Sequence, residues 1–598
     1  MKHTNLCAFF VFIDIFILII NNMAKINFFT LGGQDEQGKN CSVLEVNDDI
    51  YLFNAGSLVP INSLLGVEQL IPDYSYIVNH KKKVKGLFIG YPSQSNLGSL
   101  LYLLKSLKPQ TLTVYTSLIG KTIIESIMDK QRNFEPYKKH VNIVVLNPLK
   151  EFKINDSVSV IPFRVFSSIP YSYGFCLSTQ DGMIVYIDDF ILVNDKNKTF
   201  SSDLMDLRML ITNKKVLLLI VGAGQVGKHI SNTSPNHRSK QAIEKFMNDC
   251  KGRSIIACYD DNVYAMFTAA TIARKQQRPF IVYSQASINL FNTIIKKNMF
   301  NSRDLQTMPI SEMNNVKDAI IVVANTPHNL YNQLAKIATG EDKRLKLDSE
   351  DRFILLTPKI AGFESYEAKI LDEIARCDVI YKRLNSEVLP IKASNEDHKF
   401  LVNLLRPQYA VPIQGLYKEF VKYLEVVNQT GNFKEHQKPI LLYNGEILSF
   451  VNGKLTNKHE ELHLNSKCID TAGVQDVKSM ILSERFQMGC NGVVVLAMYF
   501  STKKMEFLDA IDIQTYGVSD EAVKLNEAIQ KCKTQIKTMQ ITFITDIKDR
   551  IEKNMKKRIT MNDYTQFKKT IRKLVGKIFE KSLFKNAAVI TSVVELEN

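Results

Sequence analysis

A motif typical of metal-dependent hydrolases spans residues 459–463. It reads His459-Glu460-Glu461-Leu462-His463, which matches H-E-x-x-H. On a helix this spacing places both imidazoles on one face to hold zinc, with the first glutamate beside a zinc-bound water. Here the motif lies in a polar stretch, GKLTNKHEELHLNSK, between strand-like segments. Residues four apart in an extended chain lie ~13 Å apart and cannot hold one ion, so no zinc site is expected here.

A glycine-rich turn after the apolar run KVLLLIV is the second candidate for chemistry. It matches G-x-G-x-x-G at Gly222, Gly224 and Gly227, and Lys228 and His229 follow. A dinucleotide site needs such glycines to open a helix whose N-terminal amides hold a pyrophosphate. The next residues predict a loop instead, and His229 stands where a P-loop needs a hydroxyl for magnesium. We therefore expect a strand-to-loop connection and no nucleotide site.

Composition limits the classes of protein and partner. The 598 residues are 45% hydrophobic and 23% charged, which predicts two or three folded domains and excludes a wholly disordered or polytopic membrane protein. Lysine and arginine outnumber the acids 76 to 61, a net charge of +15. This excess favours a polyanionic partner, nucleic acid first and an anionic membrane surface second, the alternative being an ordinary, mildly basic protein. Nine scattered cysteines without a Cys-x-x-Cys pair predict a reducing compartment, the cytoplasm, and no disulfide framework.

The first 22 residues differ from the rest of the chain. Residues 6–20 are almost wholly apolar, but this run is shorter than the roughly 20 residues of a membrane span and contains Asp14. We expect Met23 to be the natural start, so that residues 1–22 are a non-native extension. The alternative is a weak membrane anchor, and no stable membrane insertion is expected.

The hydrophobic pattern changes twice along the chain. Residues 25–186 contain short β-branched and aromatic runs bounded by turn residues, typical of strands. From about residue 215, strands alternate with helices: KVLLLIVG, RSIIACY, RPFIVYS, AIIVVAN and RFILLTP are separated by stretches such as VYAMFTAATIARKQQ. This alternation predicts a parallel sheet covered on both faces. After a polar linker come the strand GVVVLAMYF, two long helices near 521–540 and 562–586, and a closing strand. The second helix is densely basic, which indicates a solvated or a phosphate-contacting face.

Several segments, in the same order, resemble ribonuclease J, a metallo-β-lactamase-fold ribonuclease with an inserted β-CASP domain. They are LGGQDEQGKN (31–40), LFNAG (52–56), LLGVEQLIPDYSYI (64–77), FRVFSSIPYSYG (163–174), IVYIDDF (184–190), the stretch 396–420 and the stretch 470–500. The resemblance implies an α/β fold: a metallo-β-lactamase αββα sandwich, an inserted β-CASP parallel-sheet domain and a small α+β C-terminal domain. The implied boundaries are 23–222 and 386–452 for the sandwich, 223–385 for the insertion, 453–467 for a linker and 468–598 for the C-terminal domain.

The residues that hold two metal ions in that family are mostly absent. Its H-x-H-x-D-H motif falls on residues 91–96, with Tyr91, Ser93, Ser95 and Asn96 at the ligand positions. Other family positions hold Asn54, Ser167 and Gln414, and only Asp189 keeps its carboxylate. Hydroxyls and amides bind zinc poorly, and one carboxylate cannot hold two dications. We therefore expect no catalytic residue, no metal site and no cofactor.

The family's phosphate-binding loops are also changed. One falls on residues 388–394, where Lys392 and Ser394 are the remaining candidates for contacting RNA. The other falls on residues 324–330, where His328 is expected to be a loop or helix-start residue. A single magnesium held through waters by Asp35, Glu36, Asp188 and Asp189 is the remaining metal alternative.

These features predict a ribonuclease J-like protein of RNA processing or decay that is catalytically inactive. It would bind RNA or assemble with an active ribonuclease J paralogue, as a homo- or hetero-dimer or tetramer through the C-terminal domain. One alternative is a weakly active exo- or endoribonuclease dependent on zinc, magnesium or manganese. The other is a stand-alone RNA-binding protein.

Overall fold

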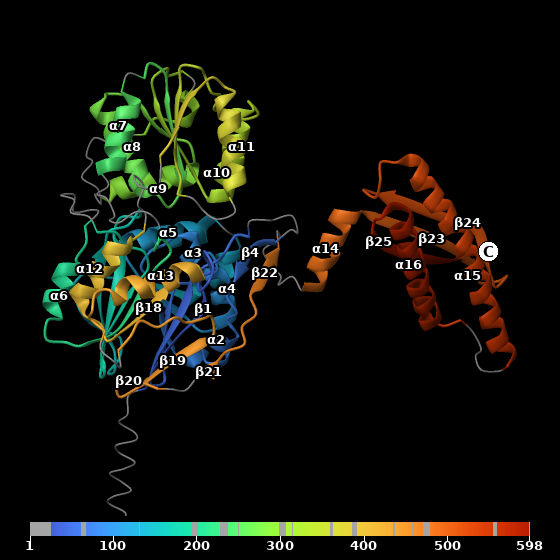
Figure 1. Cartoon of the computed structure of the whole chain (residues 1–598), viewed down its shortest axis with the longest axis horizontal. Coiled ribbons are helices and arrows are strands. Elements are labelled where there is room, and N and C mark those ends of the chain that lie inside the picture. The colour runs from blue at the N-terminus through green and yellow to red at the C-terminus, as the bar shows by residue number, and fades with distance from the viewer. Residues whose placement is uncertain are drawn as a thin grey trace, which may run out of the picture. The chain divides into compact units, whose positions relative to one another are not determined.

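The computed structural model describes most of the chain between residues 25 and 596. The described ranges are 25–60, 67–130, 132–192, 201–227, 237–248, 250–297, 307–313, 315–358, 363–384, 392–433, 437–456, 460–470, 479–553 and 559–596. The chain divides into two compact units, the first made of Met1–Ile61 with Gln69–Lys467 and the second of Asn62–Glu68 with Cys468–Asn598. The fold is mixed α/β with several sheets, as predicted (Figure 1). The predicted 1–22 extension lies outside the described residues.

Two sheets form the larger part of the first unit. The nine-stranded sheet has the order β20-β19-β1-β2-β3-β5-β6-β7, with β21 paired to β19. Its strands are β1 (Lys25–Gly32), β2 (Cys41–Val46), β3 (Asp49–Phe53), β5 (Val84–Ile89), β6 (Leu112–Thr116), β7 (Val141–Val145), β19 (Glu446–Val451), β20 (Lys454–Leu455) and β21 (Glu460–Glu461). The six-stranded sheet has the order β18-β12-β11-β10-β9-β8. Its strands are β8 (Phe152–Lys153), β9 (Ser159–Val165), β10 (Ser172–Thr179), β11 (Gly182–Ile187), β12 (Val216–Gly222) and β18 (Tyr409–Ile413).

The two sheets pack face to face and helices cover their outer faces. Large side chains from both sheets meet in one core, where Phe53 stacks on Tyr186 with ring centroids 4.2 Å apart. The outer face of the nine-stranded sheet packs on α2 (Ser75–Asn79), α4 (Leu100–Leu107) and α5 (Leu118–Lys130). That of the six-stranded sheet packs on α6 (Leu204–Leu210), α12 (Asn395–Leu405) and α13 (Tyr417–Asn428). Apolar residues on both faces of each sheet make this layered arrangement necessary.

The segment between β12 and α12 forms a separate five-stranded sheet. Its order is β14-β15-β13-β16-β17, and every pair is parallel. The strands are β13 (Ser254–Tyr259), β14 (Phe280–Val282), β15 (Ile320–Asn325), β16 (Arg352–Leu356) and β17 (Ile380–Arg383). One face packs on α7 (His237–Met247), α8 (Val263–Lys275) and α9 (Gln285–Lys296), the other on α10 (Pro327–Ala338) and α11 (Glu364–Ala375) (Figure 1).

The structure corrects two details of the sequence interpretation. KVLLLIVG forms β12, which periodicity alone grouped with the parallel-sheet series, whereas the boundaries implied by the resemblance put it in the sandwich; it pairs with β11 and β18 in the six-stranded sheet. Periodicity indicates that a strand is buried and cannot say which sheet it joins. Residues 453–467 are not only a linker, because β20 and β21 within them extend the nine-stranded sheet at β19.

The second unit has a three-stranded sheet with two long helices. The sheet order is β24-β23-β25, with β23 (Val493–Ser501), β24 (Glu506–Tyr516) and β25 (Ala588–Leu596). A third helix, α14 (Ser479–Asn491), precedes β23, while α15 (Ala522–Glu552) and α16 (Met561–Leu583) share a core with the sheet. Among the described residues, no helix is long and apolar enough to span a membrane.

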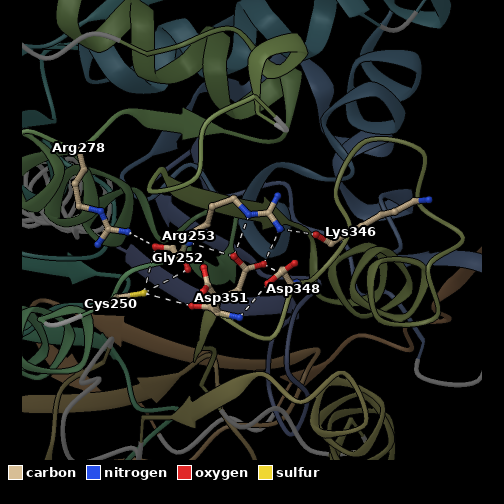
Figure 2. A network of polar contacts seen from close by, with 8 residues as sticks. Cys250, Gly252, Arg253, Arg278, Lys346, Asp348 and Asp351 are labelled. Atoms are coloured by element: carbon tan, nitrogen blue, oxygen red, sulfur yellow. Dashed lines mark hydrogen bonds and ion pairs between the residues drawn. The ribbon is translucent and has the colours of Figure 1, made fainter.

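A buried ion pair fixes the beginning of the five-stranded sheet. Arg253, which precedes β13, donates to Asp351 from Nε at 3.0 Å and from Nη2 at 2.6 Å, and its Nη2 also donates to the Lys346 carbonyl at 2.6 Å (Figure 2). Asp351 also accepts a backbone hydrogen bond from Asp348 at 2.9 Å. Asp351 is 2% exposed and Arg253 is 9% exposed, so the pair is largely withdrawn from water.

We expect the substitution Arg253→Met to lower the free energy of unfolding by about 3–5 kcal/mol, because it leaves the Asp351 carboxylate buried without a cation. Arg376→Met is the matched control, since its pair with Asp372 is largely exposed and contributes about 0–1 kcal/mol. Urea unfolding of both variants measures the difference, and equal losses would contradict a special role for the buried pair.

Candidate functional site

Several of the predicted site residues lie at the carboxyl ends of parallel strands. Asn54 follows β3, Tyr91 follows β5, Asp188 and Asp189 follow β11, and Gln414 follows β18. Because β3 is parallel to β5, and β11 and β18 are both parallel to β12, these ends meet along the edges of the two packed sheets. Such edges are where α/β proteins assemble their sites.

Asp188 is surrounded by amide donors. Asn54 Nδ2 donates to Asp188 Oδ1 at 2.6 Å, and Gln414 Nε2 donates to the same oxygen at 2.5 Å. Asp188 is 2% exposed, and burial raises its carboxyl pKa to about 6 although these two amides stabilise the carboxylate. The structure therefore brings three residues from three strand ends together around one carboxyl group.

Asp189 is paired with an ammonium group. Lys392 Nζ lies 3.1 Å from Asp189 Oδ2, and Asp189 is 6% exposed. Burial disfavours the charged ammonium, but the carboxylates of Asp189, Glu419 and Asp261 outweigh it and raise the pKa of Lys392. Lys392 is therefore positively charged at neutral pH and neutralises the carboxylate that sequence reasoning singled out.

The segment 91–96 is hydrogen-bonded within the protein. The Tyr91 hydroxyl lies 2.7 Å from Ser168 Oγ and donates to Asp261 Oδ2 at 3.3 Å. Asn96 donates to the Tyr91 carbonyl at 2.8 Å and accepts from Asn40 Nδ2 at 2.7 Å. The remaining two hydroxyls, those of Ser93 and Ser95, lie 2.8 Å apart.

Ser167 and Ser394 have local structural partners. Ser167 Oγ lies 2.9 Å from the Ile169 carbonyl and 2.7 Å from Ser172 Oγ, within its own turn. Ser394 is the N-cap of α12 and forms a capping box with Asp397. Capping satisfies the free amides of the first helical turn, so the Ser394 hydroxyl stabilises α12, while the Ser167 hydroxyl stabilises its own turn.

Two glycines of the G-x-G-x-x-G turn allow the chain to approach this site. A Cβ at Gly222 would lie 2.1 Å from the Asp188 carbonyl oxygen. A Cβ at Gly224 would lie 2.7 Å from the Gln414 carbonyl oxygen and 3.2 Å from Lys392 Nζ. Gly222 thus makes room for the Asp188 backbone and Gly224 for Gln414 and Lys392, a packing role for this part of the motif. Lys228 and His229 lie outside the described residues.

Other predicted candidates have partners elsewhere. Asp35 Oδ1 accepts from the Tyr417 amide at 2.9 Å, and Glu36 pairs with Lys39 at 3.0 Å. His328 lies in the first turn of α10, where its ring centroid is 6.4 Å from that of Tyr366. In the part of the chain that the structure describes, no three His, Cys, Asp or Glu residues are grouped as metal ligands.

The H-E-x-x-H segment is extended where it can be described. Glu460–Glu461 forms β21 and not a helical turn, while His459 lies outside the described residues. His463 lines a cavity of about 330 Å³ together with Lys39 and Asp73. Extended backbone does not bring the ends of this motif to one ion.

Sequence reasoning missed two acids that belong to this site. Asp260 and Asp261 follow β13 of the five-stranded sheet, and Asp261 accepts the Tyr91 hydrogen bond. Their position directly after the strand RSIIACY was the available signal, since strand-end acids of parallel sheets often line sites.

The raised pKa of Asp188 predicts a pH-dependent effect of Asp188→Asn. The folded chain binds this proton more tightly than the unfolded chain, so the group's contribution to stability falls as pH rises from about 4 to about 6. Asparagine does not titrate and still offers Asn54 and Gln414 an oxygen. We expect the stability of Asp188→Asn relative to the unaltered chain to increase by about 2 kcal/mol between pH 4 and pH 7.

Unfolding free energies at the two pH values measure this change. Asp48→Asn is the control, because Lys83 lowers the pKa of this exposed carboxyl and its removal gives no such gain. A relative stability of Asp188→Asn that is the same at both pH values would contradict the raised pKa.

Comparison with known proteins shows the family to which the chain belongs. No family model matches it. It is 42% identical over 574 residues to the uncharacterized protein MG423 of Mycoplasma genitalium, covering 96% of this chain and 100% of the relative. The homolog from Mycoplasma pneumoniae is 41% identical over the same length. Ribonuclease J 2 of Staphylococcus epidermidis is 26% identical over 593 residues, covering 97% of this chain and 100% of that protein. The chain therefore belongs to the MG423 family, and its nearly full-length similarity to ribonuclease J 2 supports placing it among the ribonuclease J proteins.

Proposed function

We propose that this chain is a ribonuclease J-like protein of RNA processing that does not cleave RNA itself. In this proposal it serves as an RNA-binding or assembly partner of an active ribonuclease J, and its first unit is the metallo-β-lactamase-like body with the β-CASP insertion. The observation that carries the proposal is the ion pair between Lys392 and Asp189. It supplies an internal cation at the one retained carboxylate of the family's metal positions.

The donor atoms around this ion pair do not fit two metal ions. A two-metal hydrolase needs several imidazoles and carboxylates that converge on a pair of dications. Here Asp188 Oδ1 is hydrogen-bonded to the amides of Asn54 and Gln414. A dication binding to Asp189 would have to displace Lys392 and separate this ion pair. The scaffold would therefore be kept for recognition and assembly.

A cleavage assay tests the inactive state. We expect the purified chain to degrade 5′-monophosphorylated RNA no faster than its Asp189→Ala variant, with manganese, magnesium or zinc present, because no metal-bound hydroxide forms. An active ribonuclease J in the same assay is the positive control. Metal analysis after dialysis gives a second readout, with far less than one ion per chain expected. RNA cleavage that depends on Asp189 would contradict this proposal and support the alternative, a weakly active metal-dependent nuclease.

Co-expression tests the assembly role. We expect the chain and an active ribonuclease J from the same cell to elute together in size-exclusion chromatography, with a combined mass measured by light scattering. The nuclease activity of the complex should differ from that of the active subunit alone. Separate elution together with unchanged activity would contradict a partner role and leave a stand-alone RNA-binding protein.

A further inference from the structure

Most of the excess positive charge of the chain is concentrated in one segment. Residues 553–585 contain 11 Lys and Arg against two acids, a net charge of +9 out of +15 for the whole chain. Helix α16 forms the larger part of this segment. The sequence alone left open whether its basic face is solvated or contacts phosphate.

The structure separates an apolar from a basic side of α16. The apolar side is buried against α15 and the sheet and consists of Tyr564, Phe567, Ile571, Val575, Ile578 and Phe579. On the other side, exposed lysines recur at every fourth residue, and we call this set the lysine row: Lys569, Lys573, Lys577 and Lys581. Successive members lie about 6 Å apart along the helix axis, at ~1.5 Å per residue.

The lysine row has no acidic partner within the described residues. Two lysines of the same unit do have one: Lys524 pairs with Glu521 and Lys537 with Asp509, both at 2.6 Å. The acid between members of the row, Glu580, is exposed and forms no ion pair among the residues described. Like charges four residues apart repel one another and destabilise a helix, so an external anion would stabilise this face.

An exposed aromatic ring continues the lysine row. Phe584 is the C-cap of α16, has a φ of 54° and is 90% exposed. Its spacing of three residues from Lys581 and seven from Lys577 places it on the same side of the helix. A bulky residue with positive φ is unusual, and burial does not explain this one. Lysines beside an accessible ring are the combination that single-stranded nucleic acids bind, through phosphates and stacked bases.

We propose that the lysine row and Phe584 form a contact surface for single-stranded RNA, with the ammonium groups on successive phosphates and the ring stacked on a base. This inference rests on the RNA-binding role in the proposed function and assigns that role to one face of α16. An anionic membrane is the less suitable partner, because a membrane-bound helix inserts its apolar face and that face of α16 is buried.

Fluorescence anisotropy with a labelled 20-nucleotide RNA tests the surface on the full chain. We expect replacement of all four lysines of the row by Gln to weaken binding at least 10-fold at 0.1 M salt. The slope of log K against log salt should fall by up to about 3, since each contact to a single strand contributes about 0.7. The matched control replaces four exposed lysines of the same unit that form no row, Lys503, Lys504, Lys531 and Lys548. This control should retain binding within about 3-fold.

Phe584→Ala tests the stacking contact separately. We expect binding about 5-fold weaker or more with an unchanged salt slope, and binding restored in Phe584→Trp, because base stacking needs a flat ring and no charge. Tyr516→Ala, which removes another exposed aromatic ring of the same unit, is the control. Circular dichroism should show all variants folded, since removing like charges relieves repulsion in α16.

The outcomes distinguish this inference from the proposed function. Equal weakening by the row and control variants would show a general charge effect and overturn the surface. RNA binding that persists in the row variant would also overturn it, while keeping RNA as a partner that binds elsewhere. No RNA binding by the unaltered chain would remove the RNA-binding role as well, leaving assembly. Row-dependent binding to phosphatidylserine vesicles, with RNA binding unaffected, would assign the surface to a membrane.

Discussion

A carboxylate withdrawn from water must be compensated, and the arrangement of the candidate site follows from this requirement. Asp189 is almost fully buried, and Lys392 supplies the compensating charge from the segment just before α12. Gly224 leaves the space in which the lysine lies. The neighbouring carboxyl group, that of Asp188, is instead stabilised by neutral amides and keeps a raised pKa. One cation and two amides thus contact these two carboxyl groups, while Asp188 Oδ2 and Asp189 Oδ1 have no hydrogen-bond partner among the described residues.

The five-stranded sheet contributes to the same site. Asp261 accepts the hydrogen bond of Tyr91, so a residue after β13 contacts a residue after β5. The buried Arg253–Asp351 pair lies at the opposite, N-terminal ends of β13 and β16 and holds that sheet together. Structural ion pairs and the candidate site therefore occupy different ends of the same strands, as is usual for parallel sheets.

Charged side chains are paired at the candidate site, whereas the lysine row of α16 is exposed to water. At the site, Lys392 and the surrounding carboxylates are mutually compensated, which suits a packed interior. On α16 the lysines have water and no acidic partner among the described residues, which suits an external polyanion. The proposed loss of catalysis and the proposed RNA contact thus concern separate groups of residues, and each can be altered without the other.

The sequence by itself determined most of the strands and helices, and it predicted that the residues for metal-dependent catalysis are missing. Periodicity located the buried strands and the helices between them, and the motif positions showed Tyr, Ser, Asn and Gln where a dinuclear site needs imidazoles and carboxylates. Local patterns report burial and spacing along the chain. They do not report which strands become neighbours, so periodicity alone grouped β12 with the strands of the five-stranded sheet although it pairs with β11 and β18. Only the tertiary structure decided that Lys392 meets Asp189 and Asp261 meets Tyr91, because these contacts join residues far apart in sequence whose loops converge at the strand ends.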